Sequence, residues 1–97
     1  MKEIMLFYLE RCPYCNDARR ALVELYGEDS AYSTVRIHWI EERRERELAD
    51  RYDYYYVPTI FYGEEKLYEA QPSEDYESVK SHIRAALDKV RREGEAS

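Results

Sequence analysis

The chain has 97 residues, the size of one small domain, and 44% of them are hydrophobic, which is enough for a single core. Its formal net charge of −6 argues against nucleic acid and against an anionic membrane as partners, because both require a basic face. No apolar stretch approaches the ~20 residues of a transmembrane helix, and the N-terminus lacks the pattern of a secretory signal. We therefore expect a cytoplasmic monomer.

The first half of the chain predicts a strand, a helix and a second strand. Residues 4–9 form a continuous apolar run of the length typical of a strand that is buried on both faces. Apolar residues then recur at steps of three or four from Cys15 to Leu25, which predicts a helix that Gly27 ends as a left-handed cap. The β-branched segment 33–40 predicts the next strand.

The second half predicts a helix, a β-hairpin and a final helix. Residues 41–52 carry opposite charges four positions apart, which indicates a mostly solvated helix. Strands are expected at residues 59–62 and 66–69, joined by a turn. Ser73 is expected to cap the last helix, whose apolar face runs over residues 76–90.

The element order is therefore β-α-β-α-β-β-α, an α/β fold with a mixed sheet, because a βαβ unit pairs its strands in parallel and a hairpin adds antiparallel strands. We assign residues 1–92 to a single domain and residues 93–97 to a flexible C-terminal tail. Trp39 is expected in the core, and Tyr54 and Tyr55 are expected to pack at a strand edge. His38 and His82 stand apart from other ligand-type residues, so no metal site is assigned.

The two cysteines, Cys12 and Cys15, lie at the predicted junction between the first strand and the first helix. The thiolate is the nucleophile in thiol chemistry, and the unpaired N–H groups at a helix start favour an anion. Cys12 is expected to be more exposed and to attack a substrate disulfide, whereas Cys15, one turn into the helix, resolves the mixed disulfide. Arg11 adds positive charge beside Cys12.

Two other interpretations of the cysteine pair are open. A structural disulfide that closes only four residues would stabilise the fold by about 2 kcal/mol, which makes it a poor cross-link. A metal or iron–sulfur centre would need a second chain or exogenous thiols, because two cysteines cannot fill a four-ligand site. The spacing and its context favour redox chemistry, and a dimeric metal or iron–sulfur carrier that binds through Cys12 is the alternative.

The chain resembles the glutaredoxin/thioredoxin superfamily over essentially its whole length. Residues 12–15, Cys-Pro-Tyr-Cys, match the active-site motif of dithiol glutaredoxins, and residues 57–59, Val-Pro-Thr, resemble the cis-proline loop of the superfamily. The resemblance implies a thioredoxin fold with a four-stranded mixed sheet and a cis bond before Pro58. It also implies a glutaredoxin-like thiol–disulfide oxidoreductase that reduces protein or glutathione mixed disulfides, in cell redox homeostasis and electron transport. It further implies catalysis by Cys12 and Cys15, with the loop of Val57 and Pro58 beside them as part of the substrate site. From their positions, Arg11, Tyr14 and Tyr56 are also expected to contact the substrate, with strand-edge packing as the alternative for Tyr56.

The resemblance also implies partners: disulfide-containing proteins as substrates, and either glutathione or a donor of the thioredoxin-reductase type as reductant, with no tightly bound cofactor. The sequence departs from the glutaredoxin pattern, because Tyr56 replaces a threonine and residues 67–72 lack the glycine pair that approaches the γ-glutamyl end of glutathione. Leu6 lies where thioredoxins bury an acid. We expect glutathione to be handled poorly, and a thioredoxin-like reductase that does not use glutathione is the second alternative.

Overall fold

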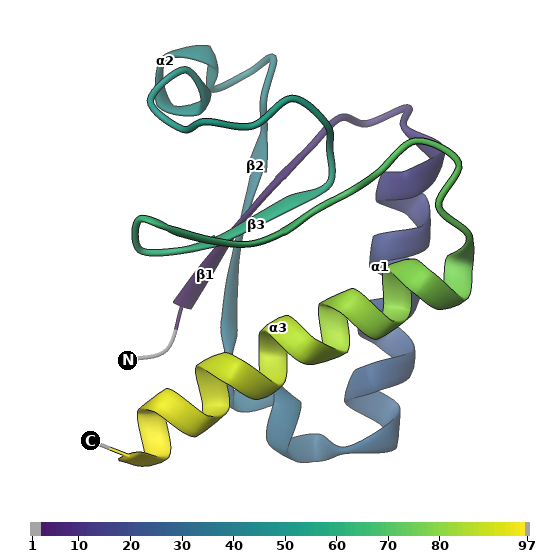
Figure 1. Ribbon diagram of the computed structural model, residues 1–97, viewed down its shortest axis with the longest axis vertical. Coiled ribbons are helices and arrows are strands. Elements are labelled where there is room, and N and C mark those ends of the chain that lie inside the picture. The colour runs from purple at the N-terminus through teal and green to yellow at the C-terminus, as the bar shows by residue number, and fades with distance from the viewer. Residues whose placement is uncertain (1–2, 97) are drawn as a thin grey trace.

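Strands and helices follow one another in the predicted order β-α-β-α-β-β-α, with one additional 3₁₀ turn after the first helix. The computed structural model describes residues 3–96, and only to these do the structural statements below apply. The elements are β1 (Glu3–Tyr8), α1 (Pro13–Glu28), η1 (Ser30–Thr34), β2 (Arg36–Glu41), α2 (Arg46–Ala49), β3 (Thr59–Tyr62), β4 (Glu65–Glu69) and α3 (Tyr76–Ala96) (Figure 1).

The four strands form one mixed sheet in the order β2-β1-β3-β4. β1 pairs with β2 in parallel and with β3 antiparallel, and β3 and β4 form an antiparallel hairpin. Its turn places Gly63 at a positive φ of 62°, a conformation that glycine adopts without steric cost. The α/β fold with a mixed four-stranded sheet and flanking helices, predicted from the sequence, is confirmed.

β1 is buried on both faces because it lies in the interior of the sheet between two cores. Ile4 and Leu6 belong to the larger core, which α1 and α3 cover on one side of the sheet (Figure 1). Phe7 belongs to a smaller core on the opposite side, where it stacks on Tyr54 with ring centroids 5.0 Å apart and contacts Tyr52 at 5.1 Å. The predicted packing role of Tyr54 thus matches its position.

The larger core yields a stability prediction at Ile83, a fully buried residue of α3. We expect Ile83→Ala to lower the free energy of unfolding by about 2–5 kcal/mol, because the truncation removes buried methyl groups and leaves a cavity. Chemical denaturation followed by circular dichroism measures the change. The control is Ser81→Ala on the exposed side of the same helix, which should stay within about 0.5 kcal/mol of the parent protein. Equal effects of the two variants would contradict the assigned core.

α1 ends differently from the expectation, because Gly27 lies inside its last turn and is not a left-handed cap. The helix continues to Glu28, and the extended residue Asp29 (φ −150°) terminates it. The N–H of Asp29 donates to the carbonyl of Leu25 (3.0 Å), and its carboxylate accepts a hydrogen bond from Ala31 N–H (2.9 Å). One aspartate therefore ends α1 and starts η1, so the second strand begins at residue 36 instead of 33.

The charged segment 41–52 contains only a four-residue helix, α2, so the prediction of a long solvated helix is wrong. A helix without a continuous apolar stripe gains little packing energy to offset its nucleation cost. One charge of this segment instead joins it to a distant part of the chain, since Arg44 forms an ion pair with Glu10, while Arg43 lies 4.0 Å from Glu41 within the segment itself.

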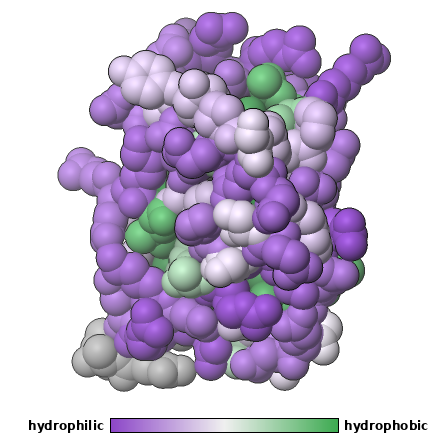
Figure 2. Space-filling model, turned by 45° about the vertical axis from the view of Figure 1, so that its right-hand side comes forward, coloured by the Kyte–Doolittle hydropathy of each residue, from purple (hydrophilic) through white to green (hydrophobic). Residues whose placement is uncertain are grey.

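Two aromatic residues that were expected to be packed lie at the surface. Trp39 is 37% exposed because it lies on the edge strand β2, where it contacts the edge of the Tyr8 ring at 5.8 Å. Tyr55 is 85% exposed, in a loop that is held through its backbone. The face drawn in Figure 2 is mostly hydrophilic, with hydrophobic side chains in small separate patches.

The start of α3 also corrects the sequence prediction. Ser73 is not the cap, since it has a positive φ of 67° and the helix begins three residues later. Asp75 takes that role, because its Oδ1 accepts a hydrogen bond from Ser78 N–H at 2.8 Å. The helical backbone continues to Ala96, past the expected end of the helix at residue 92. The flexibility of residues 93–97 stays a prediction, and Ser97 lies outside the described residues. No helix within residues 3–96 has the length and hydrophobicity needed to cross a bilayer.

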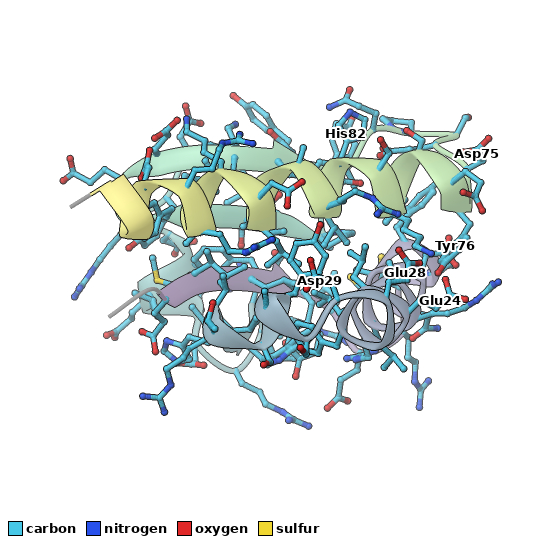
Figure 3. All side chains as sticks on the ribbon, turned by 90° about the horizontal axis from the view of Figure 1, so that it is seen from below. Glu24, Glu28, Asp29, Asp75, Tyr76 and His82 are labelled. Atoms are coloured by element: carbon cyan, nitrogen blue, oxygen red, sulfur yellow. The ribbon has the colours of Figure 1, made fainter. Side chains whose placement is uncertain are left out.

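Charged side chains connect α1 to α3 along one side of the molecule (Figure 3). Tyr76 donates a hydrogen bond to Glu24, and Lys80 lies 3.3 Å from Glu24 and 2.6 Å from Glu28. Arg84 pairs with Glu28 at 3.2 Å. The Tyr76 hydroxyl is the main group that lowers the pKa of Glu24, and Lys80 is the main group that lowers the pKa of Glu28.

These lowered pKa values predict a loss of stability in acid. A carboxylate whose pKa is lower in the folded state stabilises the fold above its ordinary value of 4.5, and this contribution disappears as the pH falls through the folded-state value. We expect the double variant with Glu24→Gln and Glu28→Gln to be less stable than the parent protein at pH 7. The difference in stability between the two proteins should shrink below pH 4.5. Thermal unfolding across this range measures it, with Glu64→Gln in the hairpin turn as control. A difference that stays constant with pH would contradict the assignment.

Candidate active site

The two cysteines lie at the N-terminal end of α1, as expected from the sequence. Cys12 is the N-cap residue with extended backbone angles (φ −100°, ψ 122°), and Pro13 occupies the first helical position, where a missing N–H costs nothing. Cys12 is half-buried, whereas Cys15, one turn further along, is only 1% exposed. Both are free thiols in the structure.

The Cys12 thiol faces the loop that carries Pro58. Its Sγ donates to the carbonyl oxygen of Val57 at 3.7 Å, a contact between residues 45 positions apart in the sequence. The Cys12 backbone is held as well, because its N–H donates to the Leu9 carbonyl (3.4 Å) and its carbonyl accepts from Asn16 N–H (3.1 Å). The end of β1 and the start of α1 therefore position this sulfur.

Burial raises the pKa of the Cys15 thiol from an ordinary value of 9.0 to about 12, because a thiolate is poorly solvated inside the protein. A hydrogen bond with Cys12 and the charge of Cys12 act in the same direction, while a backbone hydrogen bond at Leu9 and the charge of Arg19 act against it. Cys15 is therefore protonated at neutral pH, and only its partner is accessible at the surface.

The loop opposite Cys12 joins α2 to β3 and has a cis peptide bond between Val57 and Pro58, the geometry that the family resemblance implied. Pro58 is buried and Val57 is half-buried. The carbonyl of Pro58 accepts a hydrogen bond from Ala70 N–H (3.0 Å), which ties the start of β3 to the residue that follows β4. This bond fixes the loop at the end of the sheet where Cys12 lies.

Glu69 on β4 holds the preceding part of the same loop. Its Oε2 accepts hydrogen bonds from the N–H groups of Tyr55 (2.6 Å) and Tyr56 (2.8 Å), and its Oε1 pairs with Lys66 at 2.8 Å. Burial opposes ionisation, but Lys66 and the two N–H donors keep the pKa of Glu69 below its usual value. Glu69 is therefore an anionic anchor for the loop, a role that the sequence did not reveal.

A second loop, residues 71–74, lies against the Cys-Pro-Tyr-Cys motif. Ser73 N–H donates to the Tyr14 hydroxyl oxygen at 2.7 Å, which joins residues 59 positions apart. Glu74 N–H donates to the Gln71 carbonyl at 3.2 Å. Pro72 is the second residue of this segment, and Ser73, which has a positive φ, is the third. This is the pattern of a type II turn.

The two loops and the motif together line a small cavity of about 160 Å³ that is open to solvent on one side. Val57, the hydrogen-bond partner of Cys12, is part of its wall. Arg11 is exposed in the turn before Cys12 and does not line this cavity. The structure thus brings six of the seven sequence-predicted site residues together at one end of the molecule, and Arg11 lies at their edge. The cavity is lined by Tyr14, Tyr56, Val57, Ala70, Gln71 and Pro72.

Sequence reasoning missed the role of Glu74, whose side chain is only 4% exposed. Its Oε1 accepts hydrogen bonds from Gln71 N–H (3.0 Å) and the Tyr68 hydroxyl (2.8 Å), while its Oε2 accepts from Ser78 Oγ (2.7 Å) and lies 2.9 Å from His82 Nδ1. Burial opposes ionisation, but these bonds lower the pKa of Glu74. A glutamate before a helix is common on protein surfaces, so nothing in a single sequence marks this one.

Glu41 is a second buried carboxylate that sequence reasoning missed. It is 5% exposed at the end of β2 and accepts hydrogen bonds from Arg43 N–H (2.7 Å) and Glu10 N–H (3.3 Å). Glu10 lies in the turn that leads to Cys12, so Glu41 fixes the entry to the active-site loop. The available signal is its position directly after the buried residue Ile40, at the end of a predicted strand.

The fold and the site define a thioredoxin-fold protein with a cysteine pair at the start of its first helix. A malarial protein has a TM-score of 0.57 at 14% identity, over 86% of this chain and 93% of that one. A mutant thioredoxin from Halobacterium salinarum has a TM-score of 0.54 at 21% identity, over 86% and 72% of the two chains. Thioredoxin 1 from Thermosipho africanus has a TM-score of 0.57 at 15% identity, over 90% and 96%. At these identities the likeness establishes the fold.

The sequence itself identifies the family. Residues 4–67 match the glutaredoxin family, and the chain belongs to that family. No curated protein matches the sequence. The superfamily inferred from the cysteine motif and the proline loop is therefore confirmed.

Proposed function

We propose that this protein is a thiol–disulfide oxidoreductase that reduces protein disulfides through Cys12 and Cys15. One observation carries the proposal: the half-buried Cys12 thiol at the helix start contacts the Val57 carbonyl, with the buried Cys15 thiol one turn behind it. One sulfur can therefore meet a substrate while the other stays protected from it. The proposal includes a cytoplasmic monomer, with disulfide-containing proteins as its partners.

In the first step, Cys12 loses its proton and attacks one sulfur of the substrate disulfide. The substrate S–S bond breaks, one substrate sulfur leaves as a thiolate, and a mixed disulfide forms on Cys12. A sulfur without its proton no longer donates to the carbonyl of Val57. That oxygen can then accept an N–H from an extended substrate segment, as in strand addition at a sheet edge.

In the second step, Cys15 loses its proton and attacks the Cys12 sulfur of the mixed disulfide. The bond between Cys12 and the substrate breaks, the second substrate sulfur leaves as a thiolate, and a Cys12–Cys15 disulfide forms. Two electrons have passed from the dithiol to the substrate. Glutathione or a donor of the thioredoxin-reductase type then restores the two thiols.

Glutathione mixed disulfides are slow substrates in this proposal, although the motif is the glutaredoxin one. The segment after β4 carries Tyr68, Glu69 and Ala70 instead of a glycine pair. The N–H of Gln71 is already bonded to the carboxylate of Glu74, so it cannot also serve a ligand carboxylate at full strength. Loss of one charge-assisted hydrogen bond costs about 1.5–3 kcal/mol, or roughly 10- to 150-fold in affinity.

Two assays test the proposed function. We expect the protein to accelerate the reduction of insulin by dithiothreitol, and we expect slow reduction of a glutathionylated peptide with glutathione and glutathione reductase. The Cys12→Ser variant is the control for both assays. Rapid turnover of the glutathionylated peptide, at the speed of insulin reduction or above, would contradict the glutathione part of the proposal, and inactivity in both assays would contradict the whole.

A further inference from the structure

The Tyr14 hydroxyl has a specific partner outside the Cys-Pro-Tyr-Cys motif. It accepts the N–H of Ser73 at 2.7 Å, a hydrogen bond that occupies a backbone donor in the loop bordering the active-site cavity. A second donor of the same loop, Gln71 N–H, is occupied by Glu74. Two backbone N–H groups beside the cavity are therefore satisfied from within the protein.

Ser73, the partner of Tyr14, has an unusual backbone conformation. Its φ of 67° lies in the left-handed region, which residues other than glycine rarely adopt. The turn that produces this conformation is held by Glu74, whose N–H bonds to the Gln71 carbonyl and whose carboxylate is buried. Non-glycine residues keep such a conformation where the surrounding structure requires it, often at functional sites.

We propose that Tyr14 is a specificity-determining residue that disfavours disulfides carrying carboxylates. Its hydroxyl oxygen already accepts the hydrogen bond of the Ser73 N–H. A ligand carboxylate must therefore break this hydrogen bond before it can accept one from the same N–H. The carboxylate of Glu74 holds the loop that carries Ser73, and its negative charge acts in the same direction. This inference rests on the proposed function and adds the residue that selects among its substrates.

A comparison of two small disulfide substrates, one with carboxylates and one without, distinguishes the effect of carboxylates from the reactivity of the cysteines. Glutathione disulfide is anionic, bis(2-hydroxyethyl) disulfide is neutral, and each oxidises the reduced protein to the Cys12–Cys15 disulfide with release of two thiols. The measured quantity is the ratio of the two second-order rate constants, from the loss of protein thiols in a stopped-flow experiment. We expect Tyr14→Ala to raise the ratio of glutathione disulfide over the neutral disulfide by about tenfold, the equivalent of about 1.4 kcal/mol.

Tyr56→Ala is the matched control, because Tyr56 borders the same cavity but its hydroxyl does not bond to Ser73. Its absolute rates can change, but its ratio of rate constants should equal that of the parent protein. Equal ratios in all three proteins would overturn the inference, and so would a ratio that rises equally in both variants, because widening of the cavity would then explain it. Failure of the parent protein to react with either disulfide would instead contradict the proposed function.

A binding measurement keeps the inference testable if a variant reacts slowly. Titration of reduced glutathione should shift the Ser73 amide signal of Tyr14→Ala in a ¹⁵N correlation spectrum and leave that of the parent protein in place. The same shift in both proteins, or none in the variant, would overturn the inference. The spectrum also shows that the variant is folded.

Discussion

Cys12→Ser should reduce insulin no faster than the uncatalysed reaction, the largest effect expected of any single substitution. A serine hydroxyl does not attack a disulfide under these conditions, and the other thiol cannot replace Cys12 because it is only 1% exposed. The fold should be unaffected, since Cys12 is half-buried and its sulfur makes only weak hydrogen bonds, with the Val57 carbonyl at 3.7 Å and with the Cys15 thiol. Insulin precipitation measures the activity, and thermal unfolding checks the fold.

The matched variant Cys15→Ser should fail at a different step. Cys12 can still attack, but the resolving sulfur is absent, so the protein should accumulate as a mixed disulfide with its substrate. Non-reducing electrophoresis and mass spectrometry detect this species. Full insulin reductase activity in Cys15→Ser would show that the dithiol mechanism is wrong, even if Cys12→Ser is inactive.

The second large effect concerns pH and the resolving step. With a Cys15 pKa of about 12, the reactive thiolate fraction rises about tenfold for each pH unit throughout the range from pH 6 to 9. The rate of resolution should rise in the same proportion, about a thousandfold in total. The increase follows from burial, which is the main cause of the raised pKa and persists when Cys12 is bound to a substrate.

The aromatic disulfide 5,5′-dithiobis(2-nitrobenzoate) makes both steps visible, because each releases one coloured thiolate. The second release reports Cys15, and it should be absent in the Cys15→Ser variant. A second phase that does not change between pH 6 and 9 would contradict the prediction. It would mean that a neighbouring base removes the Cys15 proton.

The sequence was most informative where a local pattern determines the structure. The apolar run at residues 4–9 is typical of a strand with a core on each face, and β1 has that position. A proline next to Cys12 and an apolar stripe from Cys15 predicted a helix start at the cysteines, which is where α1 begins. Local sequence patterns are therefore sufficient to predict where these two thiols lie in the fold.

The sequence was least informative where the outcome depends on distant partners. In the sequence, Glu41 and Glu74 look like ordinary surface acids. Only the fold buries them and brings close the backbone N–H groups that donate hydrogen bonds to their carboxylates. The contact of Tyr14 with Ser73 joins parts of the chain that no local pattern connects. Trp39 is exposed because β2 is an edge strand, a position fixed by the strand order and not by the composition of the strand.

Mass spectrometry of the protein after reaction with a disulfide-bonded protein substrate tests the central claim most directly. The account predicts that the parent protein loses two hydrogen atoms, that peptide mapping finds one disulfide between Cys12 and Cys15, and that one substrate disulfide is reduced for each protein molecule oxidised. If both cysteines remain free thiols while the substrate is untouched, or if the product is a lasting adduct on Cys12, the dithiol account is contradicted.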